Sequence, residues 1–155
     1  MPITLTFDGR TVMIYSLGEA KATMADAGVA IFSVTHWAEP ALLNAEALRT
    51  ALTSMVNQAN NDGVRRAHCV SGEHRSTVAA ILYLWSQAEN KTLGAVVDAA
   101  EAAFEAAKSR LHPKIPESLE LTFDVLLSMP RSRKKWEDVR SLTYAPVVKP
   151  LLFGA

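Results

Sequence analysis

The segment from Ser76 to Gln87 constrains the fold most strongly, because it is apolar almost all round. A helix that is apolar on one side can lie on a surface, whereas a helix that is apolar on every side must be enclosed. We therefore predict that residues 76–87 form a buried central helix. The chain has 155 residues, of which 49% are hydrophobic, so it is long enough to form one domain around such a helix.

The residues just before this helix read HCVSGEHRS from His68 to Ser76, and they include the only cysteine of the chain. Five residues separate Cys69 from Arg75. A loop between a strand end and a helix N-terminus points backbone N–H groups inward, where they and the helix dipole bind a phosphate dianion and stabilise a thiolate. The pattern predicts that Cys69 is a nucleophile with a depressed pKa. Arg75 presents a planar fork that can hold two phosphoryl oxygens.

This segment resembles the signature of the cysteine-dependent protein tyrosine and dual-specificity phosphatases, in which His-Cys is followed by five residues, an arginine and a serine or threonine. Ser76 can hydrogen-bond the sulfur when it leaves as a thiolate, and Gly72 allows a tight backbone. The resemblance implies that His68 lies behind the loop and orients it. It also implies a phosphate-binding loop that consists of Val70, Ser71, Gly72, Glu73, His74 and Arg75. Two further segments, IYSLGEA at 14–20 and RLHPKIP at 110–116, are similar to the dual-specificity branch.

Two other interpretations of the cysteine stay open. A lone buried cysteine before a helix is usually a small hydrophobic residue. A zinc site is the second interpretation, but the chain has no second cysteine, and His68, Cys69 and His74 lack the usual zinc spacing. We expect neither a metal nor another cofactor.

The phosphatase reaction also needs a proton donor for the leaving oxygen. The resemblance implies an aspartate on a loop about thirty residues before the cysteine. Here that place reads THWAEPA at 35–41 and contains no aspartate. Glu39 is the first candidate for the general acid and His36 is the second, provided that the pKa is tuned toward neutrality.

Strands are predicted from alternating or continuous apolar runs. Residues Ile3–Phe7 and Thr11–Tyr15 flank Asp8-Gly9, a strong turn pair, so they predict a hairpin. Residues Val29–Val34 predict a buried strand, and Val64–His68 predict the strand that carries the loop. Within that last strand Arg65-Arg66 is an unusual pair for a central position.

Helices are predicted around the strands at 16–28, 44–60, 76–87, 92–107 and 119–127, with Asn44 and Thr92 as N-caps. Together the elements predict an α/β three-layer sandwich. It has a small, mostly parallel central sheet with helices on both faces, and the sheet ends at the cysteine loop.

We divide the chain into a catalytic domain at 1–142 and an apolar C-terminal tail at 143–155. The tail is expected to pack on the domain or on a partner subunit, so a homo-oligomer stays open. The basic segment 131–140 is either a solvated surface or a docking site for an acidic partner.

The composition favours a protein of the cytoplasm. Lys+Arg and Asp+Glu both number 16, so nothing indicates a nucleic-acid or membrane partner. The N-terminus lacks the pattern of a signal peptide, and the longest apolar run is too short to span a bilayer. A single cysteine suits a reducing compartment.

These features predict a phosphate monoester hydrolase that acts through a phosphocysteine intermediate on a phosphorylated protein or a small phosphate ester. By resemblance, phosphotyrosine protein is the leading substrate. Glu73 argues against a polyanionic inositol head group. Three alternatives remain: a catalytically weak phosphate-binding pseudophosphatase, another enzyme with a similar loop such as a sulfurtransferase or arsenate reductase, and a structural protein that assembles through the tail.

Overall fold

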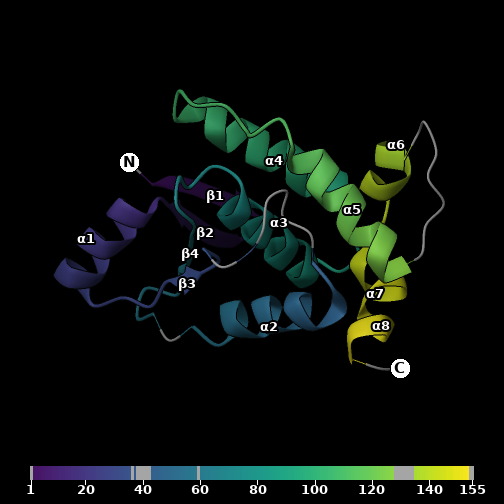
Figure 1. Cartoon of the computed structure of the whole chain (residues 1–155), viewed down its shortest axis with the longest axis horizontal. Coiled ribbons are helices and arrows are strands. Elements are labelled where there is room, and N and C mark those ends of the chain that lie inside the picture. The colour runs from purple at the N-terminus through teal and green to yellow at the C-terminus, as the bar shows by residue number, and fades with distance from the viewer. Residues whose placement is uncertain (1, 36, 38–42, 59, 128–134, 154–155) are drawn as a thin grey trace.

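The computed structural model describes residues 2–35, 37, 43–58, 60–127 and 135–153 (Figure 1). The elements, in chain order, are β1 (Ile3–Phe7), β2 (Arg10–Tyr15), α1 (Leu17–Ala27), β3 (Phe32–Ser33), α2 (Ala45–Val56), β4 (Arg65–His68), α3 (Arg75–Gln87), α4 (Leu93–Ala106), α5 (Ile115–Leu127), α6 (Lys135–Arg140), α7 (Tyr144–Val147) and α8 (Lys149–Phe153). They make an α/β fold.

Across the described residues the strands form one mixed sheet in the order β1-β2-β4-β3. Strands β1 and β2 are antiparallel, whereas β4 pairs in parallel with β2 on one side and with β3 on the other. The predicted hairpin is confirmed. Its turn uses Asp8 and Gly9 with positive φ angles of 51° and 78°, which match the right-handed twist of the two strands.

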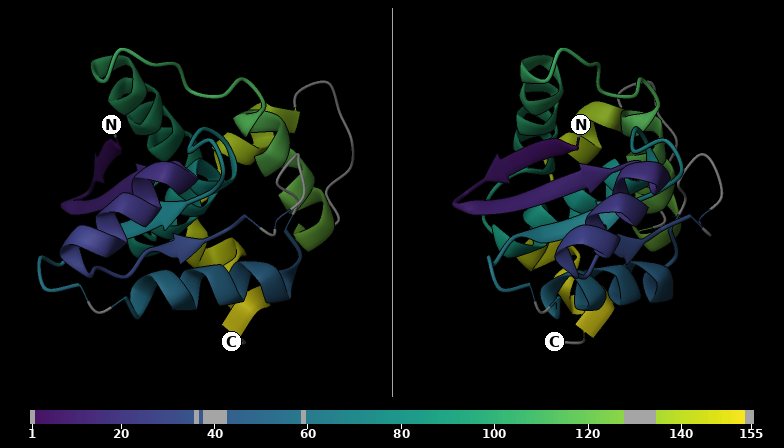
Figure 2. Two further views of the ribbon diagram at one scale, coloured as in Figure 1. Left: turned by 60° about the vertical axis from the view of Figure 1, so that its left-hand side comes forward. Right: turned by 90° about the vertical axis from the view of Figure 1, so that its left-hand side faces the viewer.

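Helices cover both faces of this sheet, as expected (Figure 2). The face toward α3 and α4 carries fully buried side chains, including Leu5, Val12, Ile14 and Ala67. Thr4 and Thr6 alternate with these residues and are exposed. Helix α1 lies on the opposite face, where it contacts β2 and leaves Thr4 and Thr6 of β1 exposed.

Helix α3 is the central helix that its composition predicts. Every residue from Ser76 to Ser86 is buried. The Trp85 ring meets Phe123 and Tyr144 edge to face, with ring centroids 5.5 Å and 5.3 Å apart. Helix α3 therefore contacts the sheet, α2, α4, α5 and α7 at once.

Two strands differ in detail from the expectation. Strand β3 has only two residues, because the backbone before it pairs with a side chain instead: Asn60 accepts from the Ala30 N–H at 2.8 Å and donates to the Ala30 carbonyl at 3.0 Å. In β4 the unusual Arg66 is buried but satisfied. Its guanidinium donates to the Tyr15 hydroxyl at 3.0 Å and to Asp62 at 2.7 Å.

The helices also differ slightly from their predicted bounds. The predicted cap of α2 is confirmed, since Asn44 accepts from the Ala47 N–H at 2.8 Å, but the helix ends at Val56 rather than near residue 60. Helix α5 begins at Ile115, four residues earlier than its apolar spacing predicts, because Pro116 is tolerated in a first turn.

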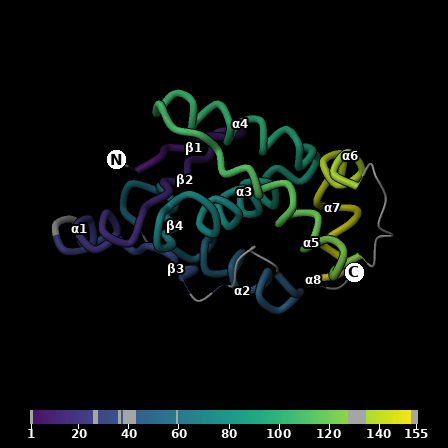
Figure 3. The backbone as a smooth tube through the Cα atoms, turned by 45° about the horizontal axis from the view of Figure 1, so that its top comes forward, coloured from purple at the N-terminus to yellow at the C-terminus, as the bar shows by residue number. Residues whose placement is uncertain are grey.

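The tail folds back onto the domain through α7 and α8, which contact α3 and α2 respectively (Figure 3). Tyr144, Val148 and Leu152 are buried in these contacts. In the basic segment, Lys135 is buried in an ion pair with Asp124 rather than solvated. No helix in the described ranges is both long and apolar enough to cross a bilayer.

Candidate active site

The candidate nucleophile lies at the carboxyl edge of the parallel strands. Strand β4 ends at His68 and Cys69 follows it directly. Backbone hydrogen bonds tie this point to the neighbouring strand ends: the Val34 N–H donates to the His68 carbonyl at 3.0 Å, and the Leu17 N–H donates to the Val70 carbonyl at 3.0 Å. Ligands of open α/β sheets usually bind at this edge.

The Cys69 sulfur is buried and has hydrogen-bond partners from the loop and from α3. It accepts from the Gly72 N–H at 3.3 Å, and the Ser76 hydroxyl lies 3.2 Å away. Burial raises the pKa of this thiol. Hydrogen bonds from the Ser76 hydroxyl and from the backbone N–H groups of Ser76, Gly72 and His74 outweigh burial, so the pKa of Cys69 is lowered from its ordinary value. This environment favours a thiolate.

Gly72 brings the loop against the end of β2. Its φ angle is +77°, a region that residues with a side chain rarely adopt. A Cβ atom at this position would come within 2.8 Å of the Ser16 nitrogen and of the Tyr15 carbonyl carbon. Only glycine allows this close approach, which points the Gly72 N–H toward the sulfur.

Arg75 connects the cysteine loop to the segment after β3. Its Nη1 donates to the carbonyls of Thr35 at 2.7 Å and Trp37 at 2.8 Å. The Trp37 ring is mostly buried and meets Phe32 edge to face, with centroids 6.3 Å apart. One guanidinium therefore joins the loop of the nucleophile to the loop expected to carry the proton donor.

The two candidate general acids, Glu39 and His36, lie outside the described residues. Thr35 and Trp37, which flank His36 in the sequence, are the two residues whose carbonyls accept from Arg75. The roles of Glu39 and His36 stay predictions.

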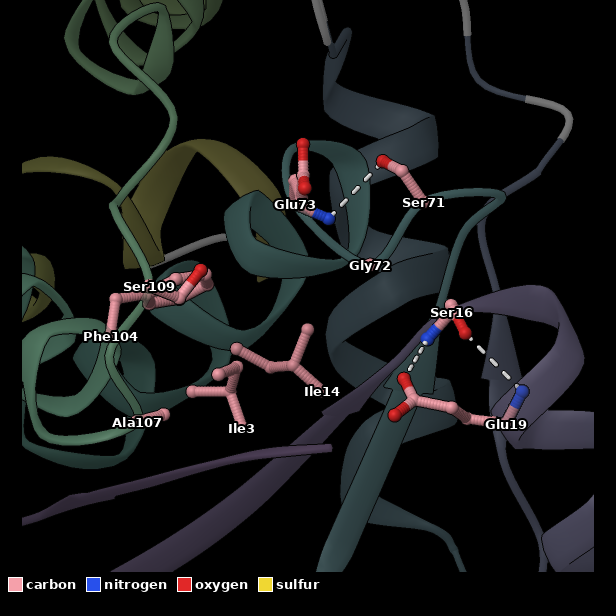
Figure 4. Close-up of a pocket in the computed structure, with 10 residues that line it drawn as sticks. All are labelled: Ile3, Ile14, Ser16, Glu19, Ser71, Gly72, Glu73, Phe104, Ala107 and Ser109. Atoms are coloured by element: carbon pink, nitrogen blue, oxygen red, sulfur yellow. Dashed lines mark hydrogen bonds between the residues drawn. The ribbon is translucent and has the colours of Figure 1, made fainter. Parts of the chain in front are cut away.

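The outer side of the loop borders a cavity of about 660 Å³ (Figure 4). Ser71 and Glu73 are exposed there, and the Glu73 N–H donates to the Ser71 hydroxyl at 3.3 Å. Val70, next to the nucleophile, is 55% exposed. The cavity extends to β1, β2, the end of α4 and the first turn of α1, where Glu19 lies. Two carboxylates therefore border this space, which disfavours a polyanionic ligand.

His68 and His74 flank the loop and are both buried. The His68 Nδ1 lies 3.4 Å from the Cys69 carbonyl, a position from which its ring could orient the loop. His74 is expected in the phosphate-binding loop, and its backbone lies there. Its side chain, however, turns inward to Ser118 of α5, with 2.6 Å between Nε2 and Oγ.

Ser118 is not among the site residues that the sequence predicts. Its helical spacing could have indicated a buried position, because Ser118 lies on the same helical face as Ile115, Leu119 and Thr122. A hydroxyl on a buried face needs a partner, since an unsatisfied buried polar group is costly.

The described residues hold no group of three or more His, Cys, Asp or Glu side chains placed to share a metal ion. Comparison with known proteins identifies no relative of this chain: no family model matches it, and neither a curated protein nor a solved structure matches it.

Proposed function

We propose that this protein is a cysteine-dependent phosphatase that hydrolyses phosphate monoesters through a phosphocysteine intermediate. The observation that carries the proposal is the environment of Cys69. Its sulfur faces the Gly72 N–H and the Ser76 hydroxyl, and its pKa is lowered although the side chain is buried. The same N–H groups that stabilise a thiolate can bind phosphoryl oxygens.

In the first step the Cys69 thiolate attacks phosphorus. A sulfur–phosphorus bond forms, the bond from phosphorus to the ester oxygen breaks, and that oxygen leaves with a proton from the general acid. In the second step water attacks phosphorus and gives a proton to the same group. The sulfur–phosphorus bond breaks, inorganic phosphate departs, and the sulfur returns to a thiolate that the Ser76 hydroxyl stabilises.

Arg75 is assigned to the phosphoryl oxygens. It begins α3, six residues after the nucleophile, and a guanidinium can hold two oxygens at once while charge builds on them. Arg75 also donates to the carbonyls of Thr35 and Trp37. The same side chain would therefore bind the substrate and hold the start of the segment that contains the proposed proton donor. Glu39 is the proposed acid, with His36 as the second candidate.

The arrangement of the fold supports the same proposal at a coarser level. A parallel strand, a loop and a buried helix place the cysteine at the carboxyl edge of a sheet that has helices on both faces. We propose that this is the three-layer, phosphatase-like sandwich that the sequence resembles. Phosphotyrosine in a protein is the proposed substrate because of the resemblance of the sequence, and the exposed Glu73 of the loop disfavours highly charged head groups.

Steady turnover of phenyl phosphate tests the proposal. Cys69→Ser should abolish turnover while vanadate still binds, because the loop N–H groups remain. Arg75→Lys should lose most of the activity, because a point charge cannot replace the planar fork. Arg10→Lys is the matched control, since Arg10 is exposed on the hairpin, and it should keep wild-type turnover.

Two outcomes would contradict the proposal. Wild-type turnover by Cys69→Ser would show that the cysteine is not the nucleophile. Vanadate binding without any turnover by the wild-type protein would favour a phosphate-binding pseudophosphatase instead.

A further inference from the structure

The His74 side chain connects the cysteine loop with α5. Its backbone ends the loop, just before Arg75, whereas its ring turns into the interior and is 1% exposed. The ring Nε2 lies 2.6 Å from the Ser118 hydroxyl oxygen, and Ser118 is fully buried. Water does not replace either partner at such a place, so the loss of one partner leaves a polar atom of the other unsatisfied.

A second ring holds His74 from another direction. His112, in the segment between α4 and α5, stacks on it with centroids 4.4 Å apart and an interplanar angle of 6°. The His112 Nδ1 in turn accepts the Lys114 N–H at 3.1 Å. The His74 ring therefore cannot rotate without breaking the contact with Ser118 or the stack on His112.

Helix α5 also contacts the chain that follows the candidate general acid. The Thr122 hydroxyl donates to the Ser118 carbonyl at 2.9 Å and accepts the Leu43 N–H at 3.4 Å. Leu43 is the first described residue after the segment that contains Glu39. One turn of α5 thus makes polar contacts with the end of the cysteine loop and with the end of the acid loop.

We propose that Ser118 is a positioning residue for the cysteine loop: by holding the His74 ring, it fixes the turn into Arg75 and so aims the loop N–H groups at the sulfur of Cys69. Burial raises the pKa of Cys69, and the His74 backbone N–H is one of the groups that lower it in spite of burial. Displacement of His74 therefore removes a hydrogen bond that stabilises the Cys69 thiolate. The inference rests on the proposed function, because it takes Cys69 to act as a thiolate.

The experiment is a pH titration of the ultraviolet absorbance of the thiolate. The chain has a single cysteine, so the signal reports on Cys69 alone, and Cys69→Ser supplies the blank. In Ser118→Ala the midpoint should rise by roughly half a pH unit to one pH unit above the wild-type value, because hydrogen bonds to the charged form are lost or lengthened. Ser118→Thr keeps the hydroxyl and should restore most of the wild-type midpoint.

Ser86→Ala is the matched control. Ser86 is also a buried helical serine, and its hydroxyl donates to the Tyr83 carbonyl at 2.6 Å, near the far end of α3 from the cysteine. This variant should leave the midpoint unchanged. An unchanged midpoint in Ser118→Ala would overturn the inference, and so would equal shifts in both variants, because equal shifts indicate a general loosening of the core.

Should Ser118→Ala alone fail to fold, the double variant Ser118→Ala with His74→Phe removes both partners and leaves no unsatisfied nitrogen. Its midpoint should rise in the same way, and a wild-type midpoint in this variant would overturn the inference. The titration requires no turnover. Absence of turnover by the wild-type protein would therefore overturn the proposed function alone.

Discussion

At the scale of single residues, the backbone at Gly72 is the most informative constraint on the cysteine loop. Two independent constraints meet there, a φ angle of +77° and a backbone approach of 2.8 Å to the end of β2. Neither the Ser16 nitrogen nor the Tyr15 carbonyl can move aside as a flexible side chain could. The backbone of the loop is therefore in direct contact with the end of β2.

Gly72→Ala should destabilise the protein by about 1–3 kcal/mol, the usual cost of a residue held in a disfavoured backbone conformation. It should also abolish turnover, because the Gly72 N–H can no longer point at Cys69. Urea unfolding and phenyl phosphate hydrolysis check the two effects. Gly18→Ala is the control: a Cβ atom at Gly18 meets nothing within 4 Å, so stability and activity should stay close to wild type.

At the scale of elements, the segment between β3 and α2 is the one expected to carry the general acid of the proposed reaction. Arg75 holds its beginning through Thr35 and Trp37, and Thr122 contacts its end at Leu43. A loop that is held at both ends can present a side chain to the same place repeatedly. Glu39 lies between these two ends in the sequence.

Glu39→Gln should lower kcat/KM for phenyl phosphate by roughly 100-fold or more, the usual range for loss of a general acid. A nitrophenyl ester should lose less, because its leaving anion is stabilised and needs the proton less. The basic limb of the pH profile of kcat/KM should flatten, since that limb reports deprotonation of the acid. His36→Asn is the parallel variant. Equal losses for both esters, with an unchanged pH profile, would show that Glu39 only shapes the loop.

At the scale of the whole molecule, the tail is part of the same hydrophobic core as the central helix. Helices α7 and α8 pack on α3 and α2, and they bury Tyr144, Val148 and Leu152 among the core residues (Figure 3). The apolar composition of the tail is thereby explained within one chain. The stability of the domain should depend on residues far from the cysteine in sequence.

Leu152→Ala should reduce the free energy of unfolding by about 2–5 kcal/mol, because it removes buried methyl groups and leaves a cavity. Leu151→Ala makes the same chemical change one residue earlier, where the side chain is 49% exposed, and should change stability by less than about 0.5 kcal/mol. Chemical denaturation of both variants gives the comparison. Equal, small effects would show that the tail does not belong to the core.

Local sequence patterns were sufficient to predict most of the helices and strands. The turn pair Asp8-Gly9 predicts the hairpin, Asn44 and Thr92 predict two helix starts, and the apolar segment 76–87 predicts the buried helix, because each of these signals acts within a few residues. The same holds for the cysteine loop. The place of Cys69 between a strand and a helix follows from neighbouring residues alone.

Other features of the fold depend on contacts between segments that are distant in the sequence. The short β3 depends on Asn60, thirty residues away from Ala30, and the buried Arg66 depends on the Tyr15 hydroxyl, fifty-one residues away. In the same way His74 turns inward because Ser118, forty-four residues further on, offers the partner that a buried ring nitrogen requires. Neighbouring residues alone indicate where the candidate nucleophile Cys69 lies in the fold. The distant side chains that hold its loop follow from packing instead, because burial removes water and each polar atom then needs a partner from whichever segment packs beside it.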